Sequence, residues 1–255
     1  MENHGKISGI KSMYFKGIFM KYSKSLIAVF TFTFLVVSIN GGTLKGHVKY
    51  DGKAPKKKRL KMDADPVCGS SHSSAVYSEN FKMGEDGSME DALVYLKNVS
   101  YSGETPSDAV ILDQKGCIYV PHVFGMMAGQ ELLIKNSDAT LHNIHSMPKV
   151  NKEFNFAMPK VVKEKKSTFA KSEPAPFYIK CDVHPWMKSW VLVSDHPYFA
   201  VTDAKGNFSI EGIPAGTYEV VCWQEKFGKR TLTAEVTIGD GDTTKDFVFT
   251  RPKKK

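Results

Sequence analysis

The sequence predicts an all-β protein, and three observations support this class. Nearly every periodic segment alternates apolar and polar residues, which is the two-residue period of a half-buried strand. Turn signals with glycine separate these segments, for example at Asp51-Gly52 and Lys205-Gly206. No amphipathic helix is evident, and residues 65–79 are the only stretch suited to a short one. The length of 255 residues allows one large domain or two small ones.

The N-terminal region reads as an export signal. A mostly apolar run, Leu26–Ile39, follows Lys21 and Lys24 and is shorter than a membrane-spanning helix requires. We therefore predict a signal peptide over residues 1–41, with Met20 as an alternative start. An uncleaved membrane anchor is the other interpretation. Either one predicts a periplasmic or secreted protein that meets the membrane only through this segment.

The predicted strands follow one another along the rest of the chain. They are Thr43–Tyr50, Ala92–Lys97, Gln130–Lys135, Phe177–Cys181, Trp190–Ser194, Asn207–Ile210, Thr217–Trp223 and Thr231–Ile238. Two regions break the pattern: residues 53–88 are rich in lysine and then serine, and residues 147–175 combine prolines with lysine clusters. Both are predicted to be long loops, which in compact domains are usually functional or mobile.

The net charge of +8 is confined to short runs. Lysines cluster in residues 1–39, in residues 53–61 and in a basic tail at 251–255, whereas acidic residues outnumber basic ones between 62 and 250. No continuous basic stripe exists, so a nucleic-acid partner is not predicted.

Four potential metal ligands lie near predicted strand ends. Cys181, His184 and Met187 are three residues apart on one hairpin loop, and His142 follows another strand upstream. Two imidazoles, a thiolate and a weak axial thioether form the ligand set of a blue-copper electron-transfer site. Structural zinc would favour paired C-x₂-C motifs, which the sequence lacks. The pattern therefore predicts one type 1 copper ion.

The motif C-x₂-H-P-x-M at residues 181–187 resembles the short ligand loop of amicyanin-type cupredoxins. The run His-Asn-Ile-His at residues 142–145 is similar to a ligand-bearing strand of the same family. The resemblance covers about residues 108–195 and implies a Greek-key β-sandwich over 107–196.

By this resemblance, His142, Cys181, His184 and Met187 are the copper ligands. Asn143 would join the two ligand loops by hydrogen bonding. His184 would be the solvent-edge ligand through which electrons pass, with Pro185 and Trp186 as the rim around it. His122 and His145 are weaker candidates for an additional ligand, and a structural role is the alternative for each.

The remaining cysteines allow one disulfide bond in an exported protein. Cys68 lies in a predicted loop and Cys117 begins a strand, so this pair is preferred. Cys222 alternates with Val220 in a strand, which is typical of a core residue. Three free buried thiols are the alternative.

A second module flanks the copper domain. Residues 202–218 contain T-D-x-x-G-x-F-x-I followed by P-x-G-x-Y, which resembles carboxypeptidase-regulatory-like (transthyretin-like) β-sandwich modules. The usual opening of that module, G-x-V-x-x-x-G-x-x-P, stands far upstream at residues 46–55. We expect residues 43–106 and 198–250 to share one small sandwich, with the copper domain inserted between them.

The leading functional hypothesis is a one-electron carrier or redox docking domain that serves a redox protein such as a dehydrogenase or cytochrome. A copper carrier or sensor, or a β-sandwich binding module without electron transfer, is the alternative. An enzyme is not expected, because the chain lacks the His-x-His pairs of multicopper oxidases and common hydrolase motifs.

Overall fold

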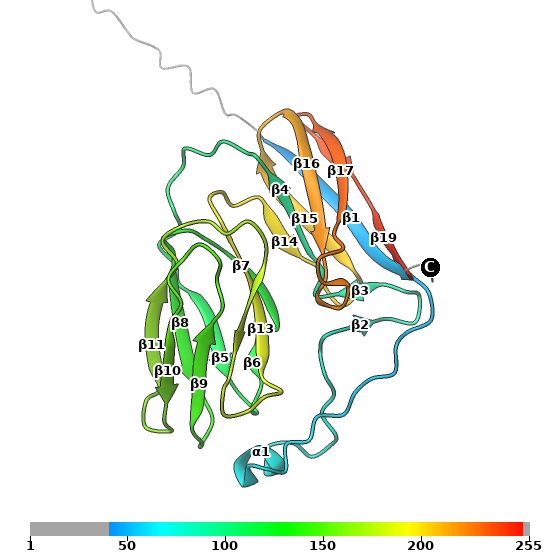
Figure 1. Cartoon of the computed structure of the whole chain (residues 1–255). Coiled ribbons are helices and arrows are strands. Elements are labelled where there is room, and N and C mark those ends of the chain that lie inside the picture. Colours follow the sequence, from blue (N-terminus) through cyan, green and yellow to red (C-terminus); the bar gives the residue numbers. More distant parts are fainter. Residues whose placement is uncertain (1–40, 252–255) are drawn as a thin grey trace, which may run out of the picture. The chain divides into compact units, whose positions relative to one another are not determined.

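A computed structural model describes residues 41–251 of the chain (Figure 1). Strands dominate this part, which confirms the all-β class. Within the described part, no helix is long and apolar enough to cross a membrane. The predicted signal segment up to residue 40 and tail residues 252–255 lie outside it.

The flanking sandwich is built from both ends of the described chain (Figure 1). One sheet contains β15 (Asn207–Ile213), β1 (Gly42–Asp51), β18 (Asp242–Thr244) and β19 (Phe247–Thr250); β1 runs antiparallel to β15 and parallel to the other two. The second sheet has the order β14 (Phe199–Val201), β4 (Leu93–Lys97), β16 (Gly216–Trp223) and β17 (Leu232–Ile238). The N-terminal and C-terminal segments therefore share one sandwich.

The inserted sandwich contains the predicted copper ligands. Its five-stranded sheet has the order β10 (Asn155–Met158), β9 (His142–Ser146), β12 (Phe177–Lys180), β13 (Lys188–Ser194) and β7 (Val123–Met127). Its four-stranded sheet has the order β11 (Glu164–Thr168), β8 (Glu131–Asn136), β5 (Val110–Gln114) and β6 (Tyr119–Val120). Strands β9 and β12 are antiparallel neighbours, and Lys180 is paired with His145. This register brings the end of β12 beside the start of β9, where Cys181 and His142 lie.

Each sandwich has its own apolar core, and a third cluster joins the two. Leu44, Val48 and Phe249 are fully buried in the flanking core, and Leu132 and Ile144 are fully buried in the inserted one. The joining cluster draws buried residues from β4 and β16 on one side and from β7 and β13 on the other; they are Leu93, Tyr95, Val221, Trp223, Val123 and Leu192. Burying each such side chain contributes roughly 1.5–3 kcal/mol to folding, so the contact between the sandwiches is a true core.

The prediction of an unstructured loop over residues 147–175 is wrong. This region contains β10 and β11, which form the outer strands of the two sheets. Every residue of β11 except Ser167 is exposed, and its lysines point to solvent at an open sheet edge. Charged edge strands carry little apolar periodicity, so the sequence pattern conceals them.

The region 53–88 also contains regular structure. It holds the short helix α1 (Pro66–Ser70) and β2 (Lys82–Met83), which forms a two-stranded hairpin with β3 (Met89–Glu90) directly after the region. The Asp65 side chain caps α1 by accepting hydrogen bonds from the backbone N–H groups of Val67 and Cys68 at 2.8 and 3.3 Å. A second short element, the 3₁₀ turn η1 (Glu225–Phe227), follows β16.

Candidate metal centre

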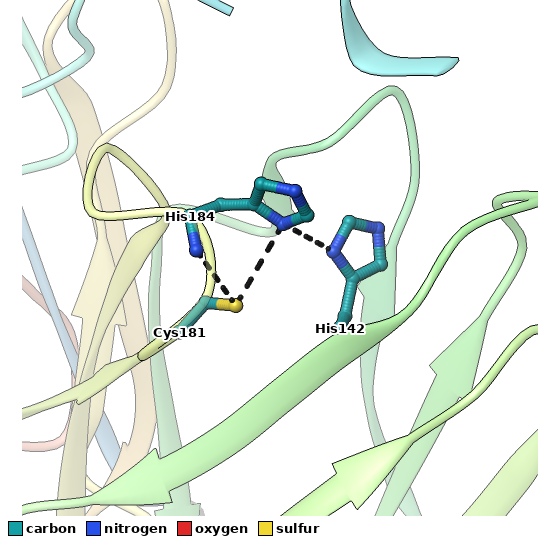
Figure 2. A group of neighbouring side chains, drawn as sticks. All are labelled: His142, Cys181 and His184. Carbon is teal, nitrogen blue, oxygen red and sulfur yellow. Dashed lines mark hydrogen bonds between the residues drawn. The ribbon is translucent and has the colours of Figure 1, made fainter. Parts of the chain in front are cut away.

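Three of the predicted ligands converge at one end of the inserted sandwich (Figure 2). His142 begins β9, Cys181 follows β12, and His184 lies in the loop between β12 and β13. One donor atom from each residue lies within 4.8 Å of the other two. The two Nδ1 atoms of His142 and His184 are 3.0 Å apart, and Cys181 Sγ is 3.8 Å from His184 Nδ1. All three side chains are buried.

Carboxylates fix the orientation of both imidazoles. His142 Nε2 lies 2.8 Å from Asp138 Oδ2, and His184 Nε2 lies 3.1 Å from Asp65 Oδ2. An ionised carboxylate only accepts hydrogen bonds, so each Nε2 carries the hydrogen and donates it. In the neutral imidazoles this leaves both Nδ1 atoms as lone-pair acceptors that face each other.

This arrangement fits a metal cation. Two facing lone pairs 3.0 Å apart need a positive species between them, either a shared proton or a metal ion. Burial opposes protonation of His142, but the hydrogen bond to Asp138 and the nearby Cys181 raise its pKa to about 8. Burial lowers the pKa of His184, and the nearby His142 adds to that effect against the opposing influence of Asp65. One proton therefore occupies the pair in the metal-free protein, and a metal ion would displace it.

The surroundings of Cys181 favour the thiolate form of its sulfur. Burial alone would raise its pKa, but hydrogen bonds from His142 and from backbone N–H groups lower it overall. The N–H groups of Asn143 and His184 both donate to Sγ at 3.3 Å. A thiolate with two imidazoles is a set that suits copper in both oxidation states.

The ligand loop is tightly closed on itself. Cys181 N–H donates to the Met187 carbonyl at 3.2 Å, and Met187 N–H donates to the His184 carbonyl at 2.9 Å. The Met187 side chain is buried in the same apolar cluster as Cys181, so Met187 stays the predicted axial ligand. Asn143 accepts a hydrogen bond from Asp182 N–H at 3.1 Å through its side-chain oxygen, which links the strand of His142 to the loop of Cys181.

The prediction that His184 lies at the solvent edge is wrong. Its side chain is only 3% exposed, because Asp65 and helix α1 cover its outer edge. Cys68 Sγ lies 3.7 Å from His184 Nε2 on the same side. Pro185 is exposed and Trp186 is half-buried, and the Trp186 ring lies beside the His184 ring with 5.0 Å between centroids.

The two weaker histidine candidates lie outside the cluster. His122 Nε2 is 2.7 Å from Glu225 Oε2, and its Nδ1 is 3.1 Å from the Lys188 carbonyl oxygen. His145 Nδ1 is 2.8 Å from Asp182 Oδ2 and its Nε2 is 2.5 Å from Glu153 Oε1. Carboxylates contact both rings, so each histidine has a structural role.

Cys68 and Cys117 form a disulfide bond, the pairing that the sequence favours. Cys222 is a free, buried thiol in the flanking core, where burial raises its pKa.

Sequence reasoning missed Asp65 and Asp138 as partners of the ligand histidines. Asp138 stands four residues before His142, a spacing that could have suggested it, because the intervening turn returns the chain to the same sheet end. Nothing local in the sequence links Asp65 to His184.

Solved structures similar to this chain include copper proteins. A Cu(I) structure of an amicyanin mutant is 22% identical over 34% of this chain and 82% of its own, with a TM-score of 0.30. The purple cupredoxin from Nitrosopumilus maritimus is 22% identical over 34% of this chain and all (100%) of its own, with a TM-score of 0.29. The copper-containing nitrite reductase from Thermus scotoductus SA-01 is 20% identical over 38% of this chain and 25% of its own, with a TM-score of 0.30. At these values the likeness fixes neither a ligand set nor an activity.

The family comparison gives a different result for the flank. A family model described as polysaccharide lyase family 4, domain II, matches residues 170–246. The matching model is therefore not the carboxypeptidase-regulatory-like module expected for 198–250, and its span also takes in β12 and β13. No curated protein matches the sequence.

Proposed function

We propose that this chain is an exported type 1 copper protein that carries one electron at a time to or from a redox protein, such as a dehydrogenase or a cytochrome. The main observation behind this proposal is that three buried donor atoms lie close together: His142 Nδ1, His184 Nδ1 and Cys181 Sγ. Bound copper would cycle between Cu(I), which the soft sulfur stabilises, and Cu(II), which the imidazoles accept.

The rigidity around these donors supports electron transfer. Asp138 and Asp65 hold the histidine rings from outside, and backbone N–H groups hold the sulfur. Such outer hydrogen bonds orient metal ligands and limit their movement. A set of ligands that moves little between the two oxidation states favours fast single-electron exchange.

Titration with Cu(II) tests the proposal. We expect the wild-type protein to take up one copper ion and to show an intense visible sulfur-to-copper absorption with a matching EPR signal. Cys181→Ser should abolish the absorption, since a hydroxyl group cannot supply the soft sulfur bond. Cys222→Ser is the matched control and should keep it, because Cys222 lies in the other core. Survival of the absorption in Cys181→Ser would refute the ligand assignment.

A copper carrier or sensor is the second candidate function. The burial of His184 beneath Asp65 and α1 favours it. A ligand with 3% exposure is poorly placed for direct contact with a protein partner. Reversible one-electron voltammetry with rapid exchange would support the electron carrier. Tight Cu(I) binding without such exchange would support the copper carrier.

A further inference from the structure

A large cavity lies beside the candidate metal centre. Its volume is about 1140 Å³, and its wall includes His184 and Trp186 from the ligand loop. The basic segment 58–61 lines another part of the wall, and Glu79 and Glu225 line the part near His122. His184 is only 3% exposed, and a small molecule in this cavity would lie next to it.

The acidic groups of the cavity already have hydrogen-bond or ion-pair partners. Glu225 Oε2 is 2.7 Å from His122 Nε2, and Glu79 Oε1 is 3.5 Å from Lys82 Nζ. Asp65 accepts hydrogen bonds from Thr140, from His184 and from the start of α1. These carboxylates therefore have little capacity left to attract a cation.

Three basic groups of the cavity are uncompensated, whereas Lys188 pairs with Glu225 at 3.9 Å. Within residues 41–251, Lys58, Arg59 and Lys61 form no ion pair. Their backbone is nevertheless fixed, because Leu60 N–H donates to the Val76 carbonyl at 2.9 Å and Ser78 N–H donates to the Lys58 carbonyl at 2.8 Å. The excess positive charge thus belongs to a preformed wall.

An apolar surface accompanies this charge. Trp186 is held in place by a 2.9 Å hydrogen bond from its Nε1–H to the Cys117 carbonyl. Leu60, Ile118 and Val183 also line the cavity. Pockets that combine apolar walls with a few directed charges are typical of small-molecule sites.

We propose that this cavity binds a small organic anion with a planar apolar body. The body packs against Trp186, and the anionic group pairs with Arg59 and its neighbouring lysines. An Arg side chain suits a carboxylate because its planar fork donates two parallel hydrogen bonds. The bound molecule lies beside His184, a candidate copper ligand, but its binding does not require copper.

The test uses the metal-free full chain and the probe benzoate, with neutral benzamide and cationic benzylamine for comparison. Calorimetry measures affinity, and the NMR signal of the Trp186 indole N–H reports location, with Trp190 and Trp223 as internal references. We expect benzoate to bind and shift the Trp186 signal, and benzamide to bind about tenfold more weakly, the effect of losing one charge-assisted hydrogen bond. Benzylamine should not bind.

Two variants distinguish benzoate binding in this cavity from general electrostatic attraction to the basic segment. Arg59→Gln should weaken benzoate binding about tenfold, whereas Lys57→Gln, which removes a neighbouring charge outside the cavity wall, should change it little. Equal affinity for benzoate and benzamide, equal effects of the two variants, or an unshifted Trp186 signal would overturn the proposal. Cys181→Ser should bind benzoate normally, so failure of copper binding and failure of this proposal remain distinguishable.

Discussion

Each ligand histidine is held by a carboxylate on the nitrogen that faces away from the cluster. Asp138 also accepts hydrogen bonds from the backbone N–H groups of Gly116 and Cys117 at 2.7 and 2.8 Å, so it is itself held in place. This chain of contacts runs from the disulfide segment through Asp138 to the ring of His142, a candidate metal ligand. The carboxylate makes the imidazole a stronger base and thus a stronger metal ligand.

Asp138→Asn should therefore lower the affinity for copper by roughly 10-fold. This is the lower end of the loss usually seen when a hydrogen-bond partner of a metal ligand is replaced. The neutral amide no longer holds the His142 ring by a charge-assisted hydrogen bond. Competition with a copper chelator of known affinity measures the change. Asp113→Asn is the matched control, because Asp113 bonds only with Ser137 on the neighbouring surface. Equal affinities for the two variants would contradict the role of Asp138.

Copper binding should also release protons near neutral pH. His142 has a pKa of about 8 in the metal-free protein, and its Nδ1 must lose its proton to bind copper. The apparent affinity should therefore rise as the pH increases from 6 to about 8 and level off above it. Chelator competition at several pH values measures this slope. A pH-independent affinity across that window would show that no proton occupies the pair.

The residue pattern identified the candidate ligands because their chemistry is local: Cys181 and His184 share one short loop. It did not reveal Asp65, because that contact depends on the path of the segment between β1 and β4. Burial of His184 was mispredicted for the same reason. Partners contributed by an irregular segment far along the chain leave no periodic signal.

At the scale of elements, the segment 59–77 is a cover over the ligand loop. It carries α1 and is tied to the inserted sandwich by the Cys68–Cys117 disulfide, which closes a sequence separation of 49 residues. The strand periodicity of residues 43–50 and 217–223 predicted β1 and β16 correctly, since β1 has one buried face and the second half of β16 is wholly buried. Edge strand β11 has no buried face, and β10 turns only Phe156 and Met158 toward the core, so both escaped prediction.

Replacement of both Cys68 and Cys117 by serine should lower the free energy of unfolding by about 4 kcal/mol, because closing a loop of this length restricts the unfolded chain. Urea denaturation measures the loss. Adding a dithiol reductant should destabilise the wild-type protein similarly and leave the double variant unchanged. A wild-type protein insensitive to the reductant would argue against a stabilising disulfide.

At the scale of the whole described molecule, the two sandwiches meet through a shared core and a buried ion pair. His122 immediately precedes β7 of the inserted sandwich, and Glu225 belongs to η1 of the flanking one. Burial disfavours the charged form of His122, but Glu225, Glu79 and Asp91 together raise its pKa above 6.5. When protonated, the ring forms an ion pair with Glu225 that links the two sandwiches.

This pair predicts a pH-dependent stability. Because the folded-state pKa of His122 is raised, its contribution is fully present below about pH 6.5 and is lost as the pH rises through the folded-state pKa. The difference in unfolding free energy between wild type and His122→Gln should therefore shrink from pH 5.5 to pH 9. Glu225→Gln should weaken this pH dependence, because Glu79 and Asp91 still raise the pKa of His122. A difference that stays constant with pH would show that the ring is neutral.

Copper K-edge X-ray absorption of the copper-loaded wild-type protein tests the central claim most directly, since it reports the atoms bound to the metal. The structure places Cys181 Sγ, His142 Nδ1 and His184 Nδ1 around one point. We predict one short copper–sulfur contact together with two copper–imidazole nitrogen contacts, and loss of the sulfur contact in Cys181→Ser but not in Cys222→Ser. A copper environment of nitrogen and oxygen atoms alone in the wild-type protein would contradict the account.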